Sequence, residues 1–198
     1  MSRLPMVPQA PDDAAIKELF DEVRAARKPD YQISNLYRTL GLSAPMFRAW
    51  LNFAWPLRLD ARSPRKLREL MILRGAQISR TAYEWAHHVP LALDAGVTQA
   101  QIEALCAWTT SDAFDGREKA VLQLAEDITR GPAASAATIE LLQQQSFDHA
   151  QIVELVLTAS FYVCVSRVLK SMDIELEPGF EAHLANFASA GAAGAEDS

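Results

Sequence analysis

Cysteine is scarce in this chain, and its scarcity excludes several kinds of site. Only Cys106 and Cys164 occur among the 198 residues, and they form no C-x-x-C pair. A thiolate zinc site and a redox dithiol both need closely spaced cysteines. We therefore expect both cysteines to be small buried hydrophobic residues.

Charge and hydropathy argue against two further classes of protein. The net charge is −6 and the basic residues form no cluster, whereas a general nucleic-acid binder needs a basic face. The most apolar stretch, residues 152–169, is interrupted by Glu154 and Arg167, which favours a core helix over a membrane span. The first thirteen residues lack the apolar segment of a signal peptide. We expect a cytoplasmic protein with neither nucleic acid nor membrane as a partner.

Strand patterns are nearly absent, and apolar residues recur at helical spacing along most of the chain. With 49% apolar and 22% charged residues, the chain can form a packed core. An all-α fold is predicted, with helices over residues 12–27, 34–40, 43–56, 63–79, 81–95, 98–105, 115–129, 135–145 and 148–172. We divide the chain into an N-terminal helical extension (1–60), a helical domain (61–175) and a C-terminal segment (176–198) with a disordered tail.

Several of these helices carry local start and stop signals. Ser63 followed by Pro64 is typical of an N-cap and a first helical residue. Asp115 and Glu118 have the spacing of a capping box. Pro90 falls inside the helix over residues 81–95, where it predicts either a kink or a break.

A weak internal repeat relates two parts of the chain. Residues 98–105 (TQAQIEAL) resemble residues 148–155 (DHAQIVEL), and an Arg-Glu pair at the start of an apolar helix lies upstream of each. These pairs are residues 68–69 and 117–118. The pattern predicts two related helical halves.

A possible acid–base cluster lies on the two helices over residues 63–95. Glu84 and His88 are four residues apart, so they share one helix face and could form a tunable proton-transfer pair. Glu69 shares a face with apolar residues, so it should point inward and needs a partner, with His88 or Tyr83 as candidates. Two simpler interpretations remain open: Glu84 and His88 form a solvated surface pair, or Glu69 pairs with a neighbouring arginine at position 65 or 68.

His87 and a metal site are less favoured interpretations of the same stretch. His87 points about 100° away from His88 on a helix, which favours a surface or interface position. Metalloprotease helices separate their two histidines by one turn, whereas His87 and His88 are adjacent. We therefore expect no metal at this stretch.

The segments LRELMILR (67–74), YEWAHHVPLA (83–92) and AGV (95–97) resemble the carboxymuconolactone decarboxylase family, whose superfamily includes the alkylhydroperoxidase D proteins. The alkylhydroperoxidase D pattern is a glutamate, a C-x-x-C pair and then a histidine. On this sequence, Glu69 and His88 take the glutamate and histidine positions, and the cysteine positions fall on Thr81 and Glu84. Thiol-based peroxide reduction needs those thiols. The decarboxylase branch also lacks them and keeps a glutamate and a histidine.

The resemblance implies an alkylhydroperoxidase D-like helical bundle, assembly into trimers or hexamers, and acid–base chemistry on a small carboxylated or lactone compound without a cofactor. The expected catalytic residues are Glu69, Glu84 and His88, where Glu84 and His88 exchange the proton and Glu69 orients His88. Tyr83, Arg74 and Arg167 are candidates for binding the substrate, although either arginine could instead form a structural ion pair. Two alternatives stay open: an antioxidant activity that uses a reactive thiol, and a non-catalytic binding or assembly protein.

Overall fold

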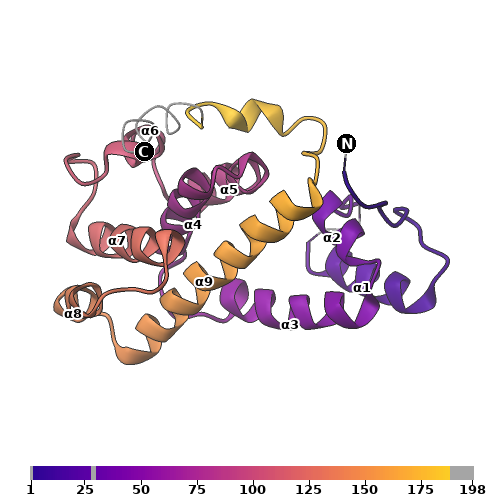
Figure 1. The fold of residues 1–198 in the computed structure, drawn as a ribbon, viewed down its shortest axis with the longest axis horizontal. Helices are drawn as coiled ribbons and strands as arrows, with labels where there is room; N and C mark the ends of the chain where they lie inside the picture. Colours follow the sequence, from indigo (N-terminus) through magenta and orange to yellow (C-terminus); the bar gives the residue numbers. More distant parts are fainter. Residues whose placement is uncertain (1, 28–29, 188–198) are drawn as a thin grey trace.

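The computed structural model describes residues 2–27 and 30–187, and the regular structure within these ranges is entirely helical (Figure 1). The all-α prediction is therefore confirmed. The helices are α1 (Ala14–Ala25), α2 (Asn35–Leu40), α3 (Ala44–Leu59), α4 (Arg65–Ser79), α5 (Ala82–Asp94), α6 (Gln99–Ala104), α7 (Gly116–Arg130), α8 (Ala136–Gln144) and α9 (His149–Met172), with short 3-10 helices η1 (Leu105–Ala107) and η2 (Glu181–Leu184). The predicted tail from residue 190 lies outside the described residues.

Side-chain caps explain where several helices begin. Thr98, Asp115 and Asp148 each accept a hydrogen bond from the backbone three residues later in a complete capping box. The expectation for Ser63 is wrong, because Pro64 is the N-cap residue of α4 and no side chain caps this helix. Ser63 is instead buried, and its backbone N–H donates to Glu154 Oε2 at 2.8 Å.

Helix α9 crosses the molecule diagonally and connects its two ends (Figure 1). It packs against α4 and α7 in one half and against α3 in the other. By length and composition alone α9 could span a membrane, but half of its most apolar window is buried inside the protein. Its place in the core fits the expectation of a core helix. Because α1, α2 and α3 share one apolar core with α9, the N-terminal extension is packed onto the helical domain.

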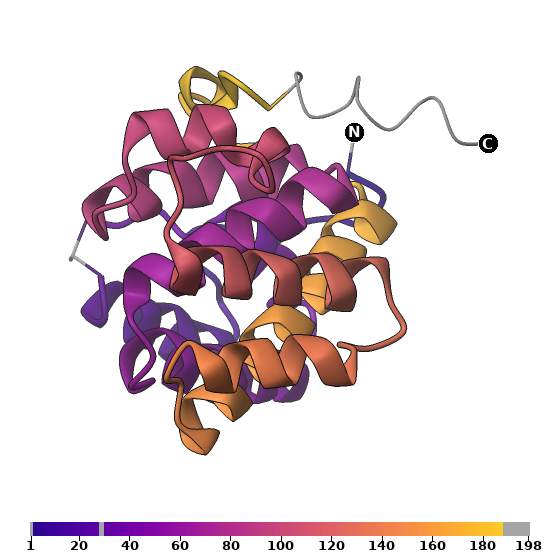
Figure 2. The same ribbon diagram turned by 90° about the vertical axis from the view of Figure 1, so that its left-hand side faces the viewer.

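The internal repeat appears in the structure as matching helix ends. Gly96 and Ser146 both have positive φ, and each stands two residues before a capping-box residue, Thr98 or Asp148. Helices α4 and α7, which open the two halves, pack against each other. Helices α7 and α8 form the face turned toward the viewer in Figure 2.

Helix α4 lies at the centre of the bundle. Ten of its fifteen residues are buried, since α5, α7 and α9 cover it on different sides. Its neighbour α5 continues past Pro90 to Asp94, so the predicted break is absent. This continuity keeps Glu84 and His88 on one helix. The C-terminal segment covers α5 from outside, where Trp85 Nε1 donates to the His183 carbonyl at 3.0 Å.

Candidate functional site

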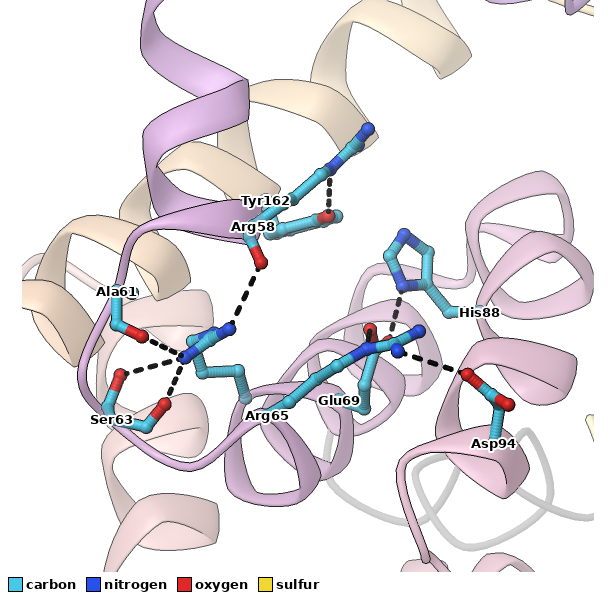
Figure 3. A network of polar contacts seen from close by, with 9 residues as sticks. Arg58, Ala61, Ser63, Arg65, Glu69, His88, Asp94 and Tyr162 are labelled. Carbon is cyan, nitrogen blue, oxygen red and sulfur yellow. Dashed lines mark hydrogen bonds and ion pairs between the residues drawn. The ribbon is translucent and has the colours of Figure 1, made fainter. Parts of the chain in front are cut away.

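Glu69 and His88 form a buried pair between α4 and α5. Glu69 Oε2 lies 2.7 Å from His88 Nδ1, and both side chains are less than a tenth exposed. Arg65 lies beside this pair, with its Nε 3.7 Å from Glu69 Oε1, and it also contacts Asp94 (Figure 3). Glu69 therefore points inward as predicted, and it contacts both a histidine and a neighbouring arginine.

The environment sets the protonation of this pair. Burial lowers the pKa of His88 below its usual range, although Glu69 opposes the shift. Burial alone would raise the pKa of Glu69, but the charge of His88 when it is protonated, the hydrogen bond from His88 and the charge of Arg65 hold it below its usual range. At neutral pH, His88 is then a neutral imidazole that donates Nδ1–H to the Glu69 carboxylate. Its Nε2 retains a lone pair, and Figure 3 shows this nitrogen pointing away from Glu69.

Glu84 is buried in a different environment. Its side chain is 2% exposed, and Oε2 accepts a hydrogen bond from Ser166 Oγ at 2.9 Å. Oε1 is buried and has no hydrogen-bond partner among the residues that the structure describes. Burial raises the pKa of Glu84 to about 8, so the carboxyl is mostly protonated at pH 7. Glu84 and His88 therefore do not pair directly as the sequence suggested, because the partner of His88 is Glu69 and that of Glu84 is Ser166.

A cavity of about 220 Å³ opens beside these groups. Glu84 and His88 contribute its acid–base groups, and a large part of its wall is aromatic. The aromatic lining residues are Tyr31, Tyr37, Tyr83, Tyr162 and Phe180. A second cavity of about 200 Å³ includes Glu69 and also reaches His88, so His88 lies in the wall between the two. This arrangement presents one neutral imidazole and one protonated carboxyl to a small molecule.

Arg58 is a further polar residue of both cavities. Its Nε donates to the Tyr162 hydroxyl at 3.2 Å and its Nη1 donates to the Tyr37 hydroxyl at 3.0 Å. The ring of Tyr162 also meets the His88 imidazole edge to face, at 4.9 Å between centroids. Tyr162 thus connects Arg58 to the Glu69–His88 pair (Figure 3).

His87 and Tyr83 form the wall next to the C-terminal segment. His87 Nε2 lies 2.7 Å from Glu177 Oε2, and its ring stacks between those of Tyr83 and Phe180. Phe180 and Glu177 cover His87 in part and leave 21% of its side chain exposed, so its surface or interface position stays a prediction. Tyr83 lines the cavity as expected of a binding residue, but its hydroxyl donates to Glu177 at 2.7 Å, not to Glu69.

Arg74 and Arg167 lie away from both cavities. Arg74 pairs with Glu126 and also donates to Gln77 at 2.9 Å, which is the structural ion pair left open by the sequence. Arg167 is exposed on α9. The structure therefore brings Glu69, Glu84, His88 and Tyr83 together and leaves both arginines outside.

The cysteines also lie outside the cavities. Cys106 is partly exposed and Cys164 is exposed, so the expectation that both are buried is wrong. Thr81, at one of the two positions aligned with the C-x-x-C pair, is the N-cap residue of α5. Within residues 2–27 and 30–187, no group of three His, Cys, Asp or Glu side chains could hold a metal ion.

Sequence reasoning missed Arg58, Tyr162, Ser166 and Glu177. Each reaches the site from an element outside α4 and α5: Arg58 from α3, Tyr162 and Ser166 from α9, and Glu177 from the C-terminal segment. One signal was available, since a serine and a tyrosine four residues apart share a face of the apolar helix α9.

Comparison with known proteins finds a matching family model and one similar sequence. The model of the carboxymuconolactone decarboxylase family matches residues 44–127. The uncharacterized protein YdfG of Bacillus subtilis is 35% identical over 95 residues, which are 47% of this chain and 64% of that protein. The aligned part thus spans less than two thirds of that relative.

Solved structures share the fold over nearly the whole chain. A peroxidase-related protein from Ralstonia eutropha, described as an alkylhydroperoxidase AhpD core, superposes with a TM-score of 0.78 at 17% identity and covers 94% of this chain and 96% of its own. The debrominase Bmp8 superposes with a TM-score of 0.77 at 15% identity, over 92% and 96% of the two chains. At these identities the likeness concerns the fold alone. Residues 44–127 are thus similar to the carboxymuconolactone decarboxylase family, and the chain shares the all-α fold of an alkylhydroperoxidase D core protein, without a C-x-x-C pair in its sequence.

Proposed function

We propose that this protein is an enzyme that performs general acid–base chemistry on a small carboxylated, lactone or other carbonyl compound. One observation carries the proposal: a carboxylate-oriented imidazole and a protonated carboxyl line the same aromatic cavity. When the environments of two such groups shift their pKa values apart, one group can act as the base and the other as the acid. Here the imidazole of His88 is the base and the carboxyl of Glu84 is the acid. A lyase of the decarboxylase type fits this chemistry better than a thiol peroxidase, because neither cysteine lines either cavity.

The proposed roles follow from the hydrogen bonds. Glu69 fixes the Nδ1–H tautomer of His88 and stabilises the imidazolium that forms when Nε2 takes an acidic proton from the substrate. Glu84 is the proton donor, since burial keeps its proton in place at neutral pH. When a substrate loses carbon dioxide, the electron pair left on carbon must take up a proton, and Glu84 can supply it. The deprotonated Glu84 then regains a proton before the next turnover.

Release of carbon dioxide from 4-carboxymuconolactone tests this proposal. We expect turnover by the wild type and a loss of about 10²-fold or more in His88→Gln, the usual effect of removing a general base. His149→Gln is the matched control, because His149 is exposed at the start of α9 and lines neither cavity. If His88→Gln and Glu84→Gln both retained wild-type turnover, the acid–base roles would be refuted. If the wild type released no carbon dioxide, this lactone would be excluded as a substrate.

A further inference from the structure

Arg58 lies where the two cavities meet, near the C-terminal end of α3. Its guanidinium is held in place by two hydrogen bonds, to Tyr37 and Tyr162. A guanidinium carries five N–H donors, so these two bonds leave three available. In Figure 3 the far end of the Arg58 side chain extends beyond the Tyr162 hydroxyl.

The partners of Arg58 do not neutralise its charge. Both are tyrosine hydroxyls, and burial raises the pKa of Tyr162 to about 12, so this hydroxyl is neutral at pH 7. Among residues 2–27 and 30–187, no carboxylate forms an ion pair with Arg58, whereas Arg74 pairs with Glu126 and Arg65 pairs with Asp94. Arg58 is half-buried, and Glu69 acts on it only at longer range, outside ion-pair distance. An anion bound directly to the guanidinium would relieve the cost of removing this charge from water.

The residues that line the two cavities do not supply a carboxylate that pairs directly with Arg58. Among residues 2–27 and 30–187, Glu84 is the only carboxyl that lines the first cavity, and it is mostly protonated at pH 7. Within the same residues, Glu69 is the only carboxyl that lines the second cavity; it contacts His88 and Arg65 directly and acts on Arg58 at longer range. Arg27 lines both cavities as a second cation. The cavities are therefore locally positive in a chain whose net charge is −6, which favours an anionic ligand.

We propose that Arg58 binds the carboxylate of the substrate and so places the adjoining carbon beside His88 and Glu84. This inference rests on the proposed function and specifies its substrate class. The aromatic walls and the modest volume of the first cavity favour a flat, unsaturated or aromatic acid. Arg58 takes the role that the sequence suggested for Arg74 or Arg167. Its fork of N–H groups is suited to a carboxylate.

Calorimetric binding of benzoate and of its neutral analogue benzamide tests this assignment, in a buffer free of phosphate and carboxylates. We expect the wild type to bind benzoate more tightly than benzamide. Arg58→Gln should weaken benzoate binding at least about 10-fold, the usual effect of losing a charged hydrogen bond, and leave benzamide binding unchanged. Arg58→Lys keeps the charge and should give an intermediate affinity, which supplies a second measurement if Arg58→Gln does not fold.

Two controls separate this inference from the proposed function. Arg62→Gln removes an arginine that pairs with Asp148 on the surface, so benzoate binding should not change. His88→Gln should still bind benzoate, because benzoate binding requires no proton transfer. Absence of benzoate binding by the wild type, equal affinity for benzamide, or full benzoate affinity in both folded Arg58 variants would overturn the assignment of Arg58. The acid–base roles would remain, since turnover tests them separately.

Discussion

Replacing Glu84 by glutamine should stabilise the protein, and increasingly so as the pH rises. Folding raises the pKa of this carboxyl from 4.5 to about 8, because the side chain is buried. Between these values the folded state holds a proton that the unfolded state has released. The free energy of unfolding therefore falls as the pH rises. Glutamine has nearly the same shape and can still accept the hydrogen bond from Ser166, but it does not titrate.

The expected magnitude follows from the two pKa values. At roughly 1.4 kcal/mol for each pKa unit, the penalty for Glu84 is about 3 kcal/mol at pH 7 and about 4 kcal/mol at pH 8, and it vanishes below about pH 4. No reduction for solvent screening applies, since the side chain is only 2% exposed. The stability difference between Glu84→Gln and the wild type should therefore grow by roughly 1.4 kcal/mol per pH unit between about pH 5 and 7.5.

Urea denaturation at pH 5, 6, 7 and 8, at one fixed protein concentration, measures this difference. Glu140→Gln is the matched control, because Glu140 is exposed on α8, and its effect should be small at every pH. A difference that does not change with pH would refute the reasoning, because Glu84 would then ionise alike in the folded and unfolded states. Destabilisation by Glu84→Gln at pH 8 would also contradict it.

Three further predictions test other parts of the structure. Leu73→Ala should cost about 2–5 kcal/mol of unfolding free energy in urea denaturation, because Leu73 is fully buried in α4 and the substitution leaves a cavity. The double variant Cys106→Ser with Cys164→Ser should keep the wild-type rate on any confirmed substrate, since neither thiol lines a cavity; a lost rate would favour thiol chemistry. We also predict a trimer or hexamer, and Phe53→Glu and Leu157→Glu, at exposed apolar positions on α3 and α9, should shift its sedimentation toward smaller species if this surface is the interface.

Local sequence signals were sufficient to predict most of the fold. The capping residues Thr98, Asp115 and Asp148 fixed three helix starts, because a cap depends only on residues within one turn. The apolar pattern around α4 also placed Glu69 inside the protein. Ser63 was misjudged because its backbone N–H donates to Glu154, which lies 91 residues away along the chain, and the sequence next to Ser63 carries no sign of this contact.

Some residues of the candidate site could be predicted from the sequence, but most of their hydrogen-bond partners could not. Glu69, Glu84 and His88 come from adjacent helices, so helical periodicity could bring them into one region. Their partners could not be assigned in the same way, since Ser166 is 82 residues from Glu84 along the chain. Arg58 looked like an ordinary charged residue near a helix end, and only the packing of α3 against α9 places it beside Tyr162.

Nitrogen NMR of the His88 imidazole tests the central claim most directly, because it needs no substrate. Comparison with His88→Gln assigns the ring signals, and a titration from pH 5 to 8 follows them. The predicted result is a neutral ring at pH 7 that is protonated at Nδ1, with a pKa below the usual value for histidine. In Glu69→Gln the preference for this tautomer should weaken. A proton on Nε2 instead, or an imidazolium at pH 7, would contradict the role of His88 as the base.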